Sequence, residues 1–253
     1  MLRYFISDLH LQAQRPEITA ALLYFLENIA PGADELYLLG DIFEAWVGDD
    51  STDPVIDQIS PAFTSLQHQG TAIFFIHGNR DFLFGPTGAN KLSAKLLPEQ
   101  HVIELPQGRT VLLHGDELCT DDTEYQAFRQ MVRAEEWQTA FLAKPLEERL
   151  AIARQLRESS EAAGAMKTEE VMDVSAKAVS EMFAKQGATL MIHGHTHRPA
   201  RHQHSKGEGE GEGEGEGEGE GEGERIVLGD WSDKGWYVVA DDNAITLVEF
   251  SPS

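Results

Sequence analysis

The first part of the chain alternates between two patterns of hydrophobic positions. Apolar runs of strand length are followed by stretches in which apolar residues recur at helical spacing. Strands are predicted within 3–10, 35–41 and 71–81, and helices within 17–30 and 53–70. Strands that alternate with helices favour parallel pairing and a layered α/β fold.

The rest of the chain divides into a helical stretch and a strand-rich end. Residues 122–186 are almost all helix-forming, and we interpret 122–166 as a helical insert that caps the main fold. A further helix, predicted within 168–187, returns to that fold. Strand patterns recur at 101–118 (two strands and a turn), 188–197, 225–231, 235–241 and 244–250. The chain is therefore predicted to form a single domain over 1–253 with a helical cap.

A pure alternation of glycine and glutamate runs from Gly207 to Glu224. Its like charges repel, and glycine backbone loses much entropy on ordering, so 207–224 is predicted to be a disordered surface loop without a function of its own. His202 and His204, just before it, are predicted to be solvated loop residues.

Composition narrows the classes of function. Hydrophobic residues make up 41% of the chain, which is enough for a core, but no apolar run is long enough to span a membrane, and the N-terminus lacks the pattern of an export signal. Cys119 is the single cysteine, which excludes an internal disulfide and fits a reducing compartment, so we expect a cytoplasmic protein.

The net charge is −23, or −14 without the nine glutamates of the tract. Binding of nucleic acid requires a basic surface, so we expect no nucleic-acid partner. If the substrate is itself an anion, a local positive charge such as a bound metal must offset the field of the protein.

Seven polar side chains share one placement, because each comes directly after an apolar run. The carboxyl ends of parallel strands open onto one crevice, so residues far apart in the chain are expected to converge there. The seven are Asp8, His10, Asp41, Asn79, His114, His195 and His197. Seven ligands are too many for one tetrahedral ion and suit two ions that share a bridging carboxylate, for which Asp41 is the natural candidate. Oxygen and nitrogen ligands without a thiolate leave manganese, iron, zinc and cobalt open.

The same blocks resemble the calcineurin-like metallophosphoesterases. "SDLH", "GDIFEAW", "GNRD", "LLHGDEL" and "HGHTH" follow the order of that family's motifs, with one departure: Arg80 stands where the general family has histidine. An arginine cannot give up a proton at neutral pH, but it binds phosphate through two N–H donors. Together with "YQAFR", "VMDV" and "HGHTHRPA", this departure makes the chain similar to the UDP-2,3-diacylglucosamine hydrolases of Gram-negative lipid A synthesis.

The resemblance implies a layered α-β-β-α sandwich with a helical cap, and a role for each matching position. It assigns Asp8, His10, Asp41 and His197 to one Mn²⁺ ion, and Asp41, Asn79, His114 and His195 to a second. It assigns catalysis to Asp41, Asn79, Arg80 and His195, and substrate contacts to Asn79, Arg80, Asp122, Ser160, Lys167 and His195. Gly164 stands where the family commonly has asparagine, so that contact is lost or moved.

The implied reaction is hydrolysis of the pyrophosphate bond of UDP-2,3-diacylglucosamine, which releases UMP and 2,3-diacylglucosamine 1-phosphate. The implied partners are this lipid and the cytoplasmic face of the inner membrane, contacted peripherally; the oligomeric state stays open. Two alternatives stay open as well: another dinuclear-metal phosphodiesterase of the superfamily, and a non-catalytic scaffold with the same fold.

Overall fold

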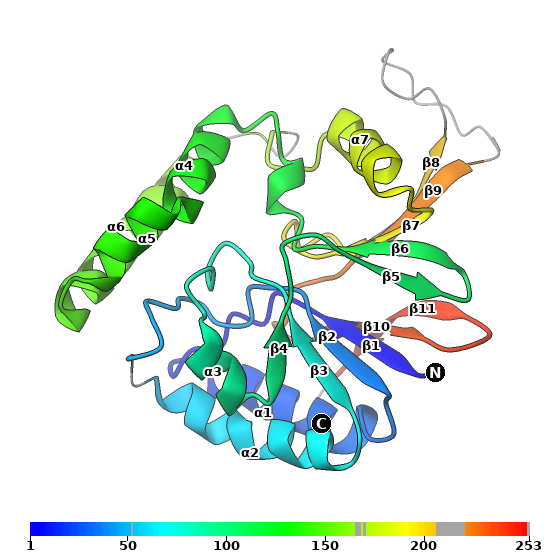
Figure 1. Ribbon diagram of the computed structural model, residues 1–253, viewed down its shortest axis with the longest axis horizontal. Helices are drawn as coiled ribbons and strands as arrows, with labels where there is room; N and C mark the ends of the chain where they lie inside the picture. Colours follow the sequence, from blue (N-terminus) through cyan, green and yellow to red (C-terminus); the bar gives the residue numbers. More distant parts are fainter. Residues whose placement is uncertain (52, 165–167, 169–170, 206–220, 252–253) are drawn as a thin grey trace.

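Two β-sheets packed face to face form the centre of the molecule (Figure 1). The structure is a computed structural model that describes residues 1–51, 53–164, 168, 171–205 and 221–251. The first sheet has the strand order β11-β10-β1-β2-β3-β4, with β1 at Arg3–Ile6, β2 at Glu35–Leu38, β3 at Ala72–Phe75, β4 at Ala94–Leu96, β10 at Gly235–Ala240 and β11 at Ile245–Phe250. The second has the order β5-β6-β7-β9-β8, with β5 at His101–Leu105, β6 at Gly108–Leu112, β7 at Leu190–His193, β8 at Ala200–Ser205 and β9 at Gly221–Val227.

Helices cover the outer face of each sheet. On the first sheet lie α1 (Pro16–Tyr24), which continues as the π-helical η1 (Phe25–Ile29), and α2 (Pro54–His68); the short α3 (Pro86–Lys91) precedes β4. On the second sheet lies α7 (Ala176–Gln186), which begins later than the helix predicted within 168–187. β4, β8 and α3 are elements that the hydrophobic pattern did not predict, because all three are short or polar.

The period-two alternation of the strands separates three apolar layers. On β2, Leu36 and Leu38 pack toward α1 and α2, while Tyr37 between them packs between the two sheets. On β7, Ile192 packs between the sheets and Met191 packs against α7. The predicted α-β-β-α sandwich is therefore confirmed.

Three helices stand apart from this sandwich, on the side shown in green at the left of Figure 1. They are α4 (Thr123–Arg133), α5 (Glu135–Leu142) and α6 (Leu146–Gly164), in the stretch that we interpret as the cap. Trp137 and Phe141 of α5 pack against the same apolar core that the buried residues of α1 and α2 belong to. In contrast, three apolar side chains of the cap helices are exposed: Met131, Leu142 and Leu150. Across the part of the chain that the structure describes, no helix is both long and apolar enough to cross a membrane.

The end of the Gly-Glu tract differs from its predicted disorder. Strand β9 begins at Gly221 and pairs with both β7 and β8, so its backbone groups are satisfied on two sides despite the poor strand propensity of the sequence. A Cβ at Gly223 would lie 2.8 Å from the Phe183 ring, which explains why a glycine fits there. His202 and His204 lie on β8, so their prediction as loop residues was wrong. The loop predicted at 207–220 lies outside the described residues.

Candidate metal centre

The structure brings together all seven predicted ligands, from the carboxyl ends of five strands in two sheets. Asp8 and His10 follow β1, Asp41 follows β2, and Asn79 follows β3. The second sheet contributes the other three side chains, from the turns after β6 and β7: His114, His195 and His197. The sheets face each other, so their strand ends meet at one place.

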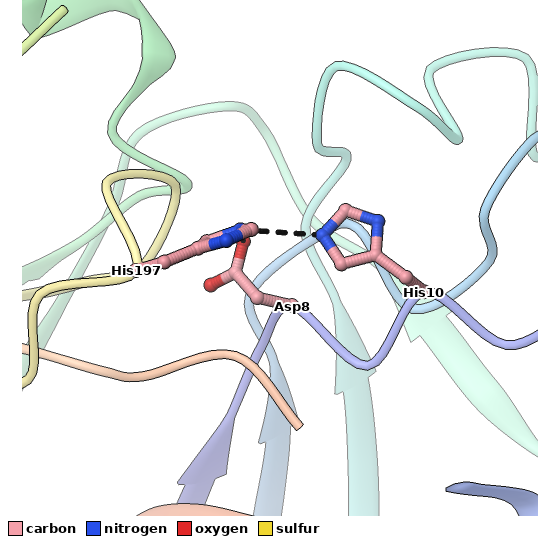
Figure 2. Close-up of side chains that lie close together, drawn as sticks. All are labelled: Asp8, His10 and His197. Atoms are coloured by element: carbon pink, nitrogen blue, oxygen red, sulfur yellow. Dashed lines mark hydrogen bonds and ion pairs between the residues drawn. The ribbon is translucent and has the colours of Figure 1, made fainter. Parts of the chain in front are cut away.

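The first group of ligand atoms comprises Asp8, His10 and His197, whose candidate ligand atoms all lie within 4.8 Å of one another. Figure 2 shows a ring nitrogen of His10 and a ring nitrogen of His197 directed toward each other, with the Asp8 carboxylate beside them. The two Nε2 atoms are 3.3 Å apart, and Asp8 Oδ1 lies 3.4 Å from His197 Nε2. Two imidazole nitrogens and a carboxylate aimed at one point are a donor set that a divalent transition metal prefers.

The second group centres on Asn79 Oδ1, which lies 2.9 Å from both His114 Nε2 and His195 Nδ1. Asp41 stands between the two groups. Its Oδ1 lies 3.6 Å from His114 Nε2, while its Oδ2 lies 3.9 Å from His10 Nε2. One carboxylate oxygen therefore faces each group, as a bridging ligand requires, and the residues fit a pair of ions.

The backbone of the ligand turns is unusual. Among the described residues, six that are not glycine have a positive φ, and five of these are predicted ligands: Asp8, His10, Asp41, His195 and His197. Such conformations cost free energy in residues with a Cβ and persist only where the surrounding structure imposes them. Asp8 shows how: its carboxylate accepts a hydrogen bond from the His195 backbone N–H at 3.1 Å, and its own N–H donates to Gly40 O at 3.1 Å. Strain concentrated at these turns indicates a functional site.

Burial and charge set the protonation of the site. Burial lowers the pKa of His195 to about 4, so its ring is neutral at pH 7 and its nitrogens can bind a metal. Burial opposes ionisation of Asp8, but the hydrogen bond and charge of His197 outweigh it and hold the Asp8 pKa well below its usual range. Burial likewise lowers the pKa of His114, yet the carboxylates of Asp41 and Asp8 outweigh this and raise it.

Asp81 holds two ligand turns together, a role that the sequence analysis missed. This fully buried carboxylate accepts hydrogen bonds from the backbone N–H groups of Gly78 (2.8 Å), Asp41 (3.3 Å), Ile42 (2.8 Å) and Phe43 (3.4 Å). It therefore fixes the turn that carries Asp41 against the turn that carries Asn79. Its place two residues after Asn79 in "GNRD" was the available signal.

A second missed network positions His195 from the side of α4. The Tyr125 ring stacks on the His195 ring, with centroids 6.0 Å apart, and the Tyr125 hydroxyl donates to buried Asp116 Oδ2 at 2.9 Å. Arg129 Nε donates to the same oxygen at 2.8 Å. One face of α4 is thereby tied to a predicted metal ligand.

The structure describes only some of the residues that are predicted to contact the substrate. Arg80 lies beside the ligands, since its backbone N–H donates to Asp41 Oδ1 at 2.8 Å, and its buried Nε has no hydrogen-bond partner among the described residues. Asp122 is buried as the N-cap of α4 and accepts from Tyr125 N at 3.0 Å. Lys167 and the side chain of Ser160 lie outside the described residues, as does the surrounding of Gly164.

Comparison with known proteins identifies the family of this chain. A model of the family "Calcineurin-like phosphoesterase" matches residues 1–199. A UDP-2,3-diacylglucosamine hydrolase of Cellvibrio japonicus is 46% identical over 96% of this chain and 96% of its own length, and one of Yersinia pseudotuberculosis is 44% identical over 99% of each. Among solved structures, the Escherichia coli phosphoesterase Yfce is 14% identical, with a TM-score of 0.43 over the full length of both chains.

The motifs that suggested the resemblance thus coincide with a family match and with relatives of nearly the same length. The predicted recognition is confirmed, and the chain belongs to the calcineurin-like phosphoesterase family.

Proposed function

We propose that the protein hydrolyses the pyrophosphate bond of UDP-2,3-diacylglucosamine, releasing UMP and 2,3-diacylglucosamine 1-phosphate for lipid A synthesis. The single observation that carries this proposal is the assembled ligand set with Arg80 beside it, in a chain 46% identical to a protein named for that hydrolysis. The site supports a phosphoester chemistry, and the name of the relative supports the substrate.

The proposed cofactor is a pair of Mn²⁺ ions. One would be held by Asp8, His10, Asp41 and His197, and the other by Asp41, Asn79, His114 and His195. Bound divalent ions supply Lewis acidity and lower the pKa of water, which makes a nucleophile available at neutral pH. In the reaction the oxygen of water joins the α-phosphorus, and the bond from that phosphorus to the bridging oxygen breaks.

The protein's own residues would orient the diphosphate for this attack. Arg80 carries a guanidinium whose buried Nε has no hydrogen-bond partner among the described residues, so it is available to bind the phosphoryl oxygens and stabilise their charge in the transition state. The neutral His195 ring lies 2.9 Å from the amide oxygen of Asn79, and both residues are proposed to contact the substrate as well. Asp122, Ser160 and Lys167 are proposed to contact the glucosamine and its phosphates.

The cap is proposed to bind the two acyl chains and to touch the membrane surface. Each buried CH₂ contributes about 0.8 kcal/mol, so the chains would dominate affinity. Exposed Met131, Leu142 and Leu150 offer apolar contact on these helices. Because the net charge of −23 opposes attraction to anionic lipid, we propose a peripheral, apolar contact at the cytoplasmic face of the inner membrane.

Incubation of the purified protein and Mn²⁺ with UDP-2,3-diacylglucosamine tests the proposal through release of UMP. We expect turnover of this lipid and much weaker turnover of UDP-glucosamine without acyl chains. Equal rates on both would refute an acyl-binding cap. Preference for a cyclic nucleotide or a nucleic acid would support the other phosphodiesterases of the superfamily, and failure to bind metal would support a scaffold.

A further inference from the structure

A cavity of about 190 Å³ lies directly behind the turn that carries two of the predicted ligands. Thr196, between His195 and His197, lines it, and so does Arg198. Asp173, in the turn before α7, lines it as well, together with His202 on β8 and Arg225 on β9. At roughly 30 Å³ for each water molecule, the cavity has room for a single aromatic ring.

Charged groups of both signs line this cavity. Arg198 Nη1 donates to Asp173 Oδ2 at 2.8 Å, so a guanidinium and a carboxylate stand side by side in one wall. Arg225 supplies a second guanidinium that is 7% exposed. The cavity therefore presents donors from Arg198, an acceptor from Asp173 and donors from Arg225.

Arg225 is held rigidly at this place. Its Nη1 lies 3.2 Å from His193 Nε2 and its Nε donates to His204 Nε2 at 3.2 Å. His193 Nδ1 lies 2.8 Å from Gly194 O, so that ring is oriented as well. A guanidinium buried against two imidazoles keeps N–H donors for a further acceptor, because arginine has five of them.

The cavity lies on the side of the metal centre that faces away from the cap. In Figure 1, α4–α6 lie on one side of the end of β7, and α7 and β8 lie on the other. If the diphosphate sits at the ligands and the acyl chains lie along the cap, the nucleoside must extend in the opposite direction. That direction leads past Thr196 to the cavity.

We propose that this cavity binds the uracil base of the substrate and of the UMP product, an inference that rests on the proposed function. The Watson–Crick edge of uracil carries an acceptor, an N–H donor and an acceptor in a row. The cavity offers complementary groups: guanidinium N–H donors from Arg198 and Arg225, and an acceptor from the Asp173 carboxylate, which also accepts from Arg198 Nη1 and Val174 N. Cytosine carries a donor and two acceptors instead, so Asp173 would face an acceptor and reject it.

Titration of the Mn²⁺-loaded protein with UMP and with CMP tests this proposal. We expect UMP to bind at least about tenfold more tightly than CMP, the factor that one mismatched hydrogen bond to a charged group implies. Asp173→Asn should reduce that preference to near unity, and Arg198→Ala should weaken UMP by about tenfold. Arg201→Ala is the matched control, because Arg201 lies three residues after Arg198, on β8, but pairs with Glu224.

Hydrolysis of bis(p-nitrophenyl) phosphate, which has no base, shows whether each variant keeps an intact metal centre. We expect all three variants to retain this activity. Equal affinity for UMP and CMP in the wild type, or an unchanged UMP affinity in both Asp173→Asn and Arg198→Ala, would overturn the assignment of the cavity. Failure of the wild type to hydrolyse the lipid substrate would overturn the proposed function instead, since UMP binding is measured separately.

Discussion

The turns that carry the predicted ligands and the helices of the cap differ in backbone conformation and in the exposure of their side chains. The turns hold buried polar side chains on strained backbone, with positive φ at five predicted ligands. The cap helices have regular backbone and leave Met131, Leu142 and Leu150 exposed, although Trp137 and Phe141 pack into the core. Metal binding requires ligand atoms placed to within fractions of an ångström, whereas binding of flexible acyl chains requires apolar area.

This difference fits the proposal that the turns carry the chemistry and that the cap binds the acyl chains. The turns are braced by carboxylates such as Asp81, which accept several backbone N–H groups. The cap is joined to the sandwich by apolar packing of Phe141 and by polar side chains such as buried Arg149. Changes in the turns should therefore abolish turnover, and changes in the cap should alter affinity for the lipid.

The largest effect is expected from Asp41→Ala. This change removes both carboxylate oxygens that face the two ligand groups. We expect kcat to fall by about 10³-fold or more and the metal content to drop, because the ions contribute several kcal/mol of transition-state stabilisation. Asp41→Asn, which tolerates positive φ, separates the lost charge from backbone strain.

Elemental analysis and steady-state kinetics measure the effect, with circular dichroism to show that the fold persists. Asp57→Ala, at an exposed ion pair with Lys91, is the control and should be fully active. An Asp41→Ala protein with two bound ions and normal turnover would show that Asp41 is no bridge.

A smaller effect is expected from Asp81→Asn, which replaces an acceptor of four backbone N–H groups by an amide with one acceptor oxygen. We expect metal affinity to weaken by about 10–100-fold, since residues that orient ligands have effects of that size. Calorimetric titration with Mn²⁺ measures it.

Asp49→Asn is the matched comparison for Asp81→Asn. Asp49 also accepts several backbone N–H groups, from Gly85, Thr87 and Gly88, but it braces a segment that carries no ligand. Both variants should lower the free energy of unfolding by about 1–3 kcal/mol. Equal loss of metal affinity in the two would argue that Asp81 acts through general stability alone.

The cap is tested by Arg149→Met. Arg149 on α6 donates to Val47 O and Lys144 O and pairs with Asp50, so it connects the cap to the segment after β2. We expect the KM for the acylated substrate to rise while hydrolysis of bis(p-nitrophenyl) phosphate stays unchanged. Arg154→Met, at an exposed position of the same helix, should do neither. A fall in both activities would contradict the separation of cap and metal centre.

The smallest effect concerns pH and His193, behind the ligand turn. Burial, and next the charge of Arg225, lower the pKa of His193 to about 3 from an ordinary value near 6.5. Between these two pKa values the His193 ring binds a proton in the unfolded chain but stays neutral in the folded protein. Its contribution to the free energy of unfolding is therefore fully present above pH 6.5 and is lost as the pH falls.

For the metal-free protein, the contribution is about 1.4 kcal/mol for each pH unit in that window. Urea unfolding at pH 5 and pH 7 measures it, and His193→Gln should flatten the dependence by about that slope. His68→Gln, at an exposed position of α2, is the control substitution. An unaltered slope in His193→Gln would mean that this ring titrates normally.

Much of the site was predictable because each ligand ends an apolar strand of recognisable period. Asp8, Asp41 and His195 could be identified in this way, and the structure brings them together. Asp81, which accepts backbone N–H groups, and Asp116, which accepts from Tyr125 and Arg129, were missed because a buried acid in a turn looks, in sequence, like any turn residue. The stacking of Tyr125 on His195 had no local signal, since the two residues are joined only through the fold.

The sequence by itself determined the alternation of strands and helices, the helical stretch after Asp122 and the choice of the seven predicted ligands, because these depend on local periodicity and residue type. Only the tertiary structure decided that the predicted ligands come from two facing sheets, that β9 begins inside the Gly-Glu tract and that a cavity lined by charges of both signs lies behind Thr196. These features depend on contacts between residues distant in the chain, where pairing with neighbouring strands outweighs local propensity.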